Sequence, residues 1–363
     1  MKTGMTLQEL STELHRQNES KLDFLVNSGS LSMEVYDERP MLRLSDAHGI
    51  DLIEPLDIRS TAHRQLGDYL GIPRRYYERL LAEDTGLLAY NVNRWLREEP
   101  ELRTIRTVDG YARAFLSNRY RCIDHLDIAE AVLPVIDELP GAQIASCNLT
   151  TDFMYIKVVW PKLTAEVTPG DVVQAGVMIS NSETGLGSVC IHPLLYRLVC
   201  TNGMTVNASQ DAGIRRCHKG RANVTSGLVE VLQPEALTNI DDDFVQKMQE
   251  TVSGALDQAK FLHHIGQMRQ SKELHLNTDH LESVVKQAGA SFKITEAESA
   301  GVLEHLMADG DYTLFGLANA VTRYSQDVNS YDRASQLEGI GYSVMTMSPL
   351  LFRQINQAPA MAA

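Results

Sequence analysis

The stretch from Gly185 to Arg221 gathers many of the side chains in this chain that could bind an anion. Its basic residues are Arg197, Arg215, Arg216, Lys219 and Arg221. They face a single acid, Asp211, in a chain whose net charge is −14. A basic cluster inside an acidic protein indicates a place where a negative ligand is bound, although it does not identify the ligand.

The same stretch also holds thiols and imidazoles, which raises the question of a zinc site. The candidate ligands are Cys190, His192, Cys200, Cys217 and His218. Zinc ligands usually come in close pairs such as C-x₂₋₄-C, and the gaps here fit no common zinc pattern. Free cysteine is also among the most commonly buried residue types. We therefore expect packing roles for these residues and no bound metal.

Signatures of covalent or nucleotide chemistry are missing from the sequence. It contains no G-x-S-x-G elbow, no GxxxxGK[ST] loop and no HExxH pair. The sequence therefore predicts no catalytic residue and no cofactor. An enzyme stays open as an alternative, because carboxylates that bind a catalytic metal need only converge in space.

Arginines interleaved with aromatic residues are the stronger signal. They occur as Arg74-Arg75 beside Tyr76-Tyr77, as Arg94 and Arg97 around Trp95, and as Arg119 and Arg121 around Tyr120. Guanidinium groups bind phosphates in a planar fork, and aromatic faces stack on unpaired bases. The competing interpretation is that the aromatic side chains are core residues and the arginines are simply solvated.

Composition places the chain among globular proteins. Of 363 residues, 44% are hydrophobic and 22% are charged. No apolar run approaches the roughly 20 residues that span a bilayer. The N-terminal segment is typical of a short amphipathic helix and not of a secretion signal. The five cysteines have no scaffold-like spacing, which favours reduced thiols and a cytoplasmic location.

Hydrophobic periodicity predicts the elements that would position these residues. Alternating patterns predict hairpins over residues 30–51 and 104–120, the second turning at Asp109-Gly110. Helical spacing covers residues 60–83, with a break at 71–73, and also 87–98 and 123–139.

Later segments are richer in β-branched residues and then turn helical. Strands are expected over residues 142–148, 154–160, 172–181 and 188–192. We expect a buried helix at residues 194–201 and a long helix from Asp241 to Lys272. The predicted fold class is α+β: a mixed sheet-and-helix core followed by an all-α C-terminal part. We divide it into an N-terminal helix (1–29), the core (30–233) and a helical region (234–363).

Four segments of this sequence are similar to a known family. They are Phe115–Ile128, Leu194–Met204, His218–Gly220 and Ala318–Glu338. In this order they resemble the phage/plasmid-like protein family, also known as domain of unknown function 932. The resemblance implies a bacterial mobile element as the setting, and it implies no established reaction.

These observations support one leading hypothesis and two alternatives. We expect a phage- or plasmid-associated protein that binds or anneals single-stranded DNA as a homo-oligomer, without a membrane partner. Phosphates would be held by the five basic residues of the 185–221 stretch together with Arg119 and Arg121, and Tyr120 and Trp95 would stack on bases. The alternatives are a metal-dependent nuclease or other nucleic-acid-processing enzyme, and a non-catalytic protein that acts on host defence or replication.

Overall fold

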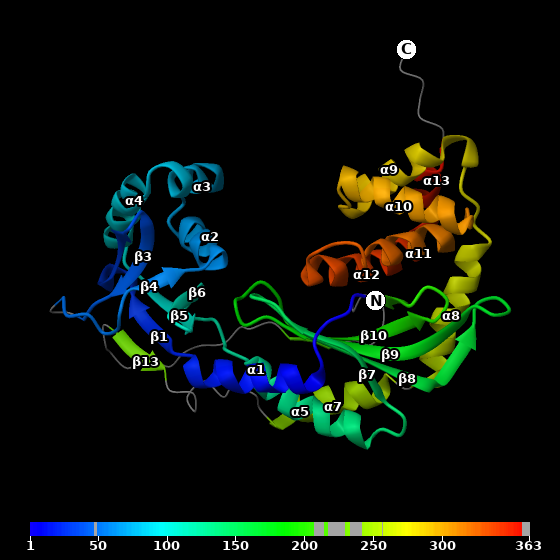
Figure 1. Cartoon of the computed structure of the whole chain (residues 1–363), viewed down its shortest axis with the longest axis horizontal. Helices are drawn as coiled ribbons and strands as arrows, with labels where there is room; N and C mark the ends of the chain where they lie inside the picture. The colour runs from blue at the N-terminus through cyan, green and yellow to red at the C-terminus, as the bar shows by residue number, and fades with distance from the viewer. Residues whose placement is uncertain (47–48, 207–213, 217–228, 233–241, 256, 358–363) are drawn as a thin grey trace, which may run out of the picture.

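A computed structural model describes residues 1–46, 49–206, 214–216, 229–232, 242–255 and 257–357. The chain forms two lobes, each built on its own β-sheet (Figure 1). In the described ranges, no helix is both long enough and apolar enough to cross a membrane.

The first lobe contains a seven-stranded sheet with the strand order β13-β1-β5-β6-β4-β3-β2. Its strands are β1 (Asp23–Asn27), β2 (Leu31–Tyr36), β3 (Arg39–Leu44), β4 (Leu56–Ile58), β5 (Leu102–Val108), β6 (Tyr111–Ser117) and β13 (Val229–Leu232). Three helices complete this lobe: α2 (Ser60–Tyr69), α3 (Arg74–Glu83) and α4 (Thr85–Glu98). Buried leucines from the helices, such as Leu66, Leu88 and Leu96, pack on the sheet in a single cluster.

The hairpin expected at Asp109-Gly110 is confirmed by β5 and β6. Both turn residues have positive φ, 52° at Asp109 and 76° at Gly110. A two-residue loop with two positive φ angles matches the twist of the flanking strands, which is why Asp-Gly is favoured there. The break expected at residues 71–73 is confirmed as well, because α2 ends at Tyr69 and α3 begins at Arg74.

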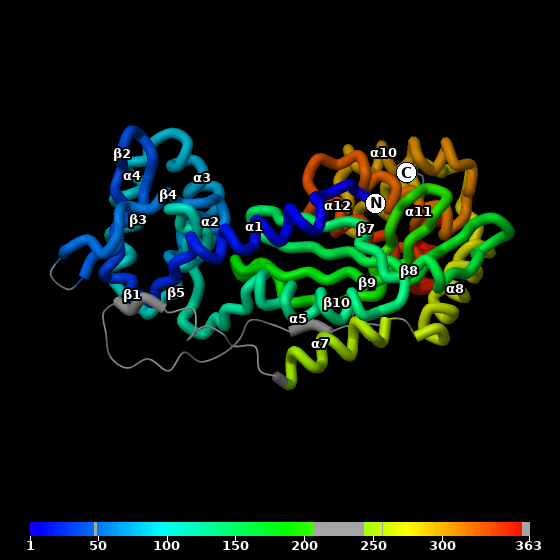
Figure 2. Tube along the Cα trace, turned by 60° about the horizontal axis from the view of Figure 1, so that its bottom comes forward, coloured from blue at the N-terminus to red at the C-terminus, as the bar shows by residue number. Residues whose placement is uncertain are grey.

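The second lobe is a six-stranded sheet between helical layers. Its main strand order is β11-β10-β9-β8-β7, with β12 paired to β10. The strands are β7 (Gln143–Leu149), β8 (Met154–Glu166), β9 (Val172–Asn181), β10 (Val189–Arg197), β11 (Asn202–Thr205) and β12 (Ile214–Arg216). Helices α1 (Leu7–Ser20), α5 (His125–Glu138) and α7 (Asp242–Gly254) lie on one side of this sheet (Figure 1). Figure 2 shows α1 extending from the first lobe along the second.

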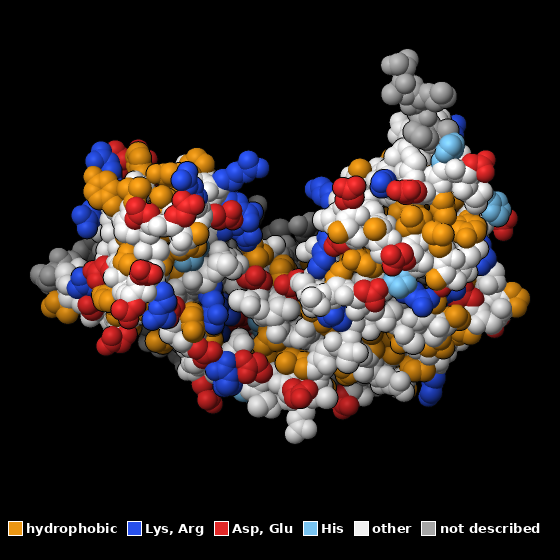
Figure 3. Space-filling model, turned by 45° about the horizontal axis from the view of Figure 1, so that its top comes forward, with side chains coloured by type: hydrophobic (Ala, Val, Ile, Leu, Met, Phe, Trp, Pro, Cys, Tyr) orange, Lys and Arg blue, Asp and Glu red, His pale blue; other side chains and the backbone are white. Residues whose placement is uncertain are grey.

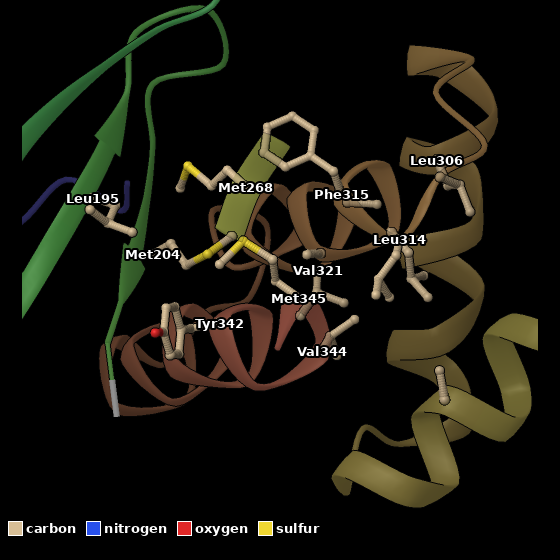
Figure 4. Packing of buried hydrophobic residues seen from close by; sticks show 14 of the residues in the cluster. Leu195, Met204, Met268, Leu306, Leu314, Phe315, Val321, Tyr342, Val344 and Met345 are labelled. Atoms are coloured by element: carbon tan, nitrogen blue, oxygen red, sulfur yellow. The ribbon is translucent and has the colours of Figure 1, made fainter. Parts of the chain in front are cut away.

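The C-terminal helices build the other layer of the second lobe. They are α8 (Gln258–Lys272), α9 (Leu281–Phe292), α10 (Glu296–Asp309), α11 (Leu314–Tyr324), α12 (Tyr331–Met345) and α13 (Pro349–Ile355). Figure 4 shows how Leu195 and Met204 from the sheet meet Met268 of α8 and Tyr342 of α12. The predicted fold class, an α+β core followed by an all-α C-terminal part, is therefore confirmed.

Two local predictions were wrong. Residues 194–201 do not form a helix, because β10 continues to Arg197 and pairs with both β9 and β11. Ladder hydrogen bonds on both sides of the strand outweigh the helical preference of its leucines. The long helix expected up to Lys272 is two helices, because α7 ends at Gly254 and the side chain of Asp257 caps a new start by accepting from the Lys260 backbone N–H.

Candidate nucleic-acid interface

The two lobes meet at two turns of the second sheet. In the β7–β8 turn, the Asp152 carboxylate accepts a hydrogen bond from the Thr61 hydroxyl of α2 at 2.9 Å. The same carboxylate oxygen accepts from the Thr184 hydroxyl of the β9–β10 loop at 3.1 Å. The Gln65 amide of α2 donates to the Thr184 carbonyl at 2.7 Å. Side chains of α2 thus fix the first lobe to both turns.

Above these turns the surface is hollowed into a cleft. The Thr150 hydroxyl donates to Asp332 at 3.0 Å, which places the start of α12 on the side opposite to α2. The cleft therefore has the two turns as its floor, with Leu186 39% exposed there. Figure 3 shows Lys and Arg side chains on both of its walls.

A cluster of buried charges lies at the junction of the lobes. We call it the junction cluster, and its members are Lys21, Asp23, Arg106, Arg113, Asp124 and Glu183. Three cations balance three anions, so the cluster is neutral as a whole. Buried charges are tolerated when they are paired in this way.

Arg106 is the centre of the junction cluster. A bulge between Arg106 and Thr107 interrupts the pairing of β5 with β6. The Arg106 guanidinium donates to Asp23 at 2.9 Å and to Asp124 at 2.6 Å. It also donates to the Glu183 backbone carbonyl at 3.3 Å. One arginine of the first lobe thereby binds the segment between β6 and α5 and the loop that follows β9.

Glu183 is held as an anion by the same cluster. Burial by itself would raise the pKa of Glu183, but attraction to Arg113 lowers it well below its usual range. Its carboxylate forms an ion pair with Arg113 and accepts from the His125 backbone N–H at 2.5 Å. Each charged group of the cluster is paired with an opposite charge in the same cluster, which indicates a positioning role.

Arg119, Tyr120 and Arg121 lie in the segment that joins the two lobes. Arg119 is exposed, and no described side chain pairs with it. The Tyr120 hydroxyl donates to the Ser182 carbonyl at 3.1 Å, and burial raises its pKa. Arg121 is half-buried. Of these three, Arg119 is the one whose charge is most available to a ligand.

Arg197 lies far from that segment. It ends β10, eight residues beyond Val189, which at about 3.3 Å per residue is roughly 26 Å along the strand. Its guanidinium donates to both oxygens of Asp171 at 2.5 and 3.0 Å and to Cys200 Sγ at 3.3 Å. Binding a phosphate here would require breaking this two-point ion pair.

The remaining predicted phosphate ligands lie at the edge of the second sheet or outside the described residues. The backbones of Arg215 and Arg216 pair with Cys190 and Val189 at the start of β10. Their side chains, and the whole of Lys219 and Arg221, lie outside the described part of the chain. The structure therefore places Arg215 and Arg216 at the other end of β10 from Arg197.

A family assignment follows from comparison with known proteins. The family model described as "Domain of unknown function (DUF932)" matches residues 114–356. The chain belongs to this family. No characterised protein and no solved structure matched the chain. The resemblance expected from the sequence is confirmed, and the family assignment carries no functional evidence of its own.

Two of the motifs that resemble DUF932 contain residues with identifiable structural roles. The motif at Phe115–Ile128 supplies Asp124 to the junction cluster and Tyr120, whose hydroxyl donates to the Ser182 carbonyl in the β9–β10 loop. The motif at Ala318–Glu338 supplies Asp332, which binds Thr150, and Glu338, which forms a fully buried ion pair with Lys157 at 2.7 Å. Both motifs thus hold the second sheet to its neighbours.

A different surface carries aromatic rings and arginines that are exposed to solvent. We call it the basic–aromatic face, and it consists of exposed residues on α3 and α4: Arg74, Arg75, Tyr76, Arg79, Tyr90, Arg94, Trp95 and Arg97. The aromatic members are 45% (Tyr76), 64% (Tyr90) and 45% (Trp95) exposed. The face belongs to the first lobe and precedes the segment matched by the family.

The geometry of α4 explains why these side chains are exposed. At about 100° per residue, Leu88, Val92 and Leu96 share one stripe, and all three are buried against the sheet. Arg94 lies on the opposite side of the helix, between Tyr90 and Trp95 around the axis. The sequence indicates a cluster of arginines around Trp95, but only the packing of α4 determines which rings face solvent.

The arginines of the face differ in how they are paired. Arg74 and Arg79 form exposed ion pairs with glutamates one turn away, each at 2.7 Å. Arg75, Arg94 and Arg97 have no carboxylate within ion-pair distance among the described residues. Exposed pairs contribute about 0–1 kcal/mol, so even the paired guanidiniums are easily recruited by a phosphate.

The described residues lack the arrangement of ligands that a metal site requires. No group of three or more His, Cys, Asp or Glu side chains in this part of the chain could hold a metal ion. Cys190 and His192 lie two residues apart on β10, Cys200 lies beyond its far end, and Cys217 and His218 fall outside the described residues. The carboxylates of the junction cluster are already neutralised by arginine and lysine.

Proposed function

We propose that this protein binds single-stranded nucleic acid through the basic–aromatic face, with Arg119 as a further phosphate contact. The observation that carries the proposal is the combination of three exposed aromatic rings with three arginines that lack a protein partner in the described structure. Stacking of a base on an aromatic side chain is worth about 1–3 kcal/mol, and guanidinium groups hold the phosphates between bases.

The overall charge of the protein shapes how it would bind. A chain of net charge −14 repels a polyanion at long range, so affinity must come from a confined surface. Residues 226–363 carry 18 acidic and 9 basic residues and would keep the strand away from the C-terminal helices. We therefore expect binding that is local and strongly dependent on salt.

The residues singled out from the sequence enter the proposal with different weights. Arg119 is exposed and is retained as a phosphate contact. Arg121, Arg215, Arg216, Lys219 and Arg221 are retained as candidate contacts of a longer strand. Tyr120 and Arg197 are given structural roles instead, because each is engaged with the protein itself. The bacterial mobile element as a setting and assembly as a homo-oligomer also remain part of the proposal.

The alternatives are less well supported. A metal-dependent nuclease needs carboxylates that converge without cations, and the convergent carboxylates of the junction cluster are paired with Arg106, Arg113 and Lys21. A protein interface would also use exposed tryptophan, tyrosine and arginine. If nucleic acid does not bind, the result will favour a protein interface at this surface.

The test measures fluorescence anisotropy of a labelled 15-nucleotide single strand at several salt concentrations. The triple variant Arg75→Ala, Arg94→Ala, Arg97→Ala should bind more weakly. Each phosphate contact contributes a log–log salt slope of about −0.7, so losing three should reduce the slope by about 2. Trp95→Ala should also weaken binding about fivefold or more, and Trp95→Phe should retain most of it.

A matched control removes three exposed lysines elsewhere: Lys162→Ala, Lys260→Ala, Lys293→Ala. This control has the same net charge as the arginine variant, so it separates a local site from bulk attraction. Equal loss of binding in both triple variants would refute the basic–aromatic face as the interface. No binding by the wild-type protein at about 50 mM salt would refute the proposed function.

A further inference from the structure

A small cavity opens beside the basic–aromatic face, between α2 and α3. Its volume is about 100 Å³. The residues that line it are Ser60, His63, Arg64, Gly67, Asp68, Ile72, Arg74, Tyr77, Glu78 and Leu81. Its lining combines an apolar set, Ile72, Tyr77 and Leu81, with two arginines and two acidic residues.

Gly67 helps to create this space. A Cβ atom at residue 67 would lie 3.0 Å from Cδ2 of Tyr77, closer than ordinary van der Waals contact. Glycine therefore lets the Tyr77 ring pack directly against α2. The flat ring and the neighbouring apolar side chains give the cavity walls that suit a planar apolar group.

His63 supplies the polar group of the cavity. Only 8% of its surface is exposed, and Nδ1 lies 2.9 Å from the Tyr77 hydroxyl. Burial lowers the pKa of His63 to about 4, so the imidazole is neutral at pH 7. One ring nitrogen then carries a proton and can donate a hydrogen bond, and the other can accept a hydrogen bond.

The hydrogen bond with Tyr77 indicates which nitrogen is protonated. Burial raises the pKa of Tyr77, so its hydroxyl keeps its proton. No other acceptor for that hydroxyl is found in the described structure, so the O–H donates to Nδ1 of His63. The proton of the imidazole is then on Nε2, which has no protein partner among the described residues and can donate to a ligand.

The size of the cavity limits the ligand. An apolar cavity of about 150 Å³ accommodates benzene, so about 100 Å³ admits one edge of a six-membered ring and not a fused pair of rings. A donor at His63 requires an acceptor on the ring that enters. Arg74 is paired with Glu78 at 2.7 Å, whereas Arg64 forms no ion pair in the described structure and is the lining residue that an attached phosphate would contact.

We propose, resting on the proposed function, that this cavity receives the carbonyl-bearing edge of one pyrimidine base of the bound strand, with that oxygen accepting from Nε2 of His63. Thymine and cytosine both have such an oxygen on a six-membered ring. Adenine lacks a carbonyl and is a fused ring system, and guanine has a carbonyl but shares the larger size. The cavity therefore gives the interface a preference for pyrimidine strands.

The test compares the affinities of labelled dT15, dC15 and dA15 for the wild-type protein and for a cavity-filling variant. Leu81→Trp fills the cavity from its apolar wall. Ser60→Phe fills it from an exposed residue, which guards against a folding defect in the first variant. Leu350→Trp is the control, because it makes the same exchange at a residue that is 62% exposed in the other lobe.

We expect dT15 and dC15 to bind the wild-type protein at least fivefold more tightly than dA15. This ratio should fall towards one in both filled variants and stay unchanged in Leu350→Trp. The ratio in wild type alone is not sufficient, because adenine strands stack on themselves and bind many proteins less well. The change of the ratio with cavity filling is the diagnostic quantity.

Two kinds of failure remain distinguishable. Tight binding of all three strands with a ratio that does not respond to Leu81→Trp or Ser60→Phe would overturn the base pocket and leave the proposed function intact. Absence of binding to any strand would overturn the proposed function itself, and the pocket with it.

Discussion

Replacing Arg106 with leucine should destabilise this protein far more than replacing an arginine that is paired on the surface. Arg106 is completely buried and forms ion pairs with Asp23 and Asp124 at 2.8 and 2.6 Å. Arg79 forms an ion pair of similar length, 2.7 Å, with Glu83, but both side chains are more than half exposed. The two substitutions therefore differ in burial and not in pairing distance.

The loss of folding stability depends on which charges each substitution leaves without a partner. Without Arg106, Asp124 keeps its ion pair with Lys21, but Asp23 loses its cation and is only 1% exposed. Leaving one partner of a buried pair uncompensated costs about 3–5 kcal/mol. Arg79→Leu should cost less than about 1 kcal/mol, because exposed pairs contribute little. The double variant Arg106→Leu, Asp23→Leu should recover more than half of the loss, since no lone buried charge remains at residue 23.

Urea unfolding followed by circular dichroism measures all four proteins. With a slope of about 3 kcal/mol per molar urea, Arg106→Leu should lower the midpoint by about 1 M or more, and Arg79→Leu by at most about 0.3 M. If Arg106→Leu and Arg79→Leu shifted the midpoint equally, or if the double variant were no more stable than Arg106→Leu, our account of the junction cluster would be refuted.

Two further predictions concern pH and packing. Burial lowers the folded-state pKa of His63 and of His125 from 6.5 to about 4. Between about pH 6.5 and pH 4 the unfolded chain therefore binds more protons than the folded chain. Both groups thus make the free energy of unfolding fall as the pH drops through this range. The urea midpoint of His63→Gln should therefore depend less steeply on pH than that of wild type, and equal slopes would contradict this. In thermal melts, Gly341→Ala should destabilise the protein by about 1–3 kcal/mol, because its Cβ would lie 2.2 Å from Thr322. Gly266→Ala has open space around the new Cβ, so it should be neutral or stabilising by up to about 1 kcal/mol.

Local patterns were enough to predict most of the elements of the first lobe. The Asp109-Gly110 turn, the break before α3 and the strands β2 and β3 each follow from residues that are close in sequence. Turn residues with positive φ and helix-breaking proline act within a few residues, so their effect can be read without knowing the rest of the fold.

The division into two lobes could not be predicted in the same way. β1 lies between β13 and β5, which are separated from each other by more than 100 residues along the chain. Short strands of this kind have no local signal that selects their partner, because the choice depends on which sheet has an open edge. The same holds for Arg197, whose partner Asp171 comes to it only when β9 and β10 pair.

Which aromatic residues of the candidate interface are exposed could not be predicted from the sequence, because exposure depends on helix packing. Tyr76 and Tyr77 are neighbours in the sequence and equally suited to stack on a base, yet one is 45% exposed and the other 3%. Adjacent residues on a helix point about 100° apart, so the stripe of α3 that packs on α2 and α4 decides which ring is exposed. Tyr77 turns inward with Leu80 and becomes a wall of the α2–α3 cavity, while Tyr76 turns outward with the arginines. One dipeptide thus supplies both the stacking surface and the pocket beside it, and the packing of α3 is what separates the two roles.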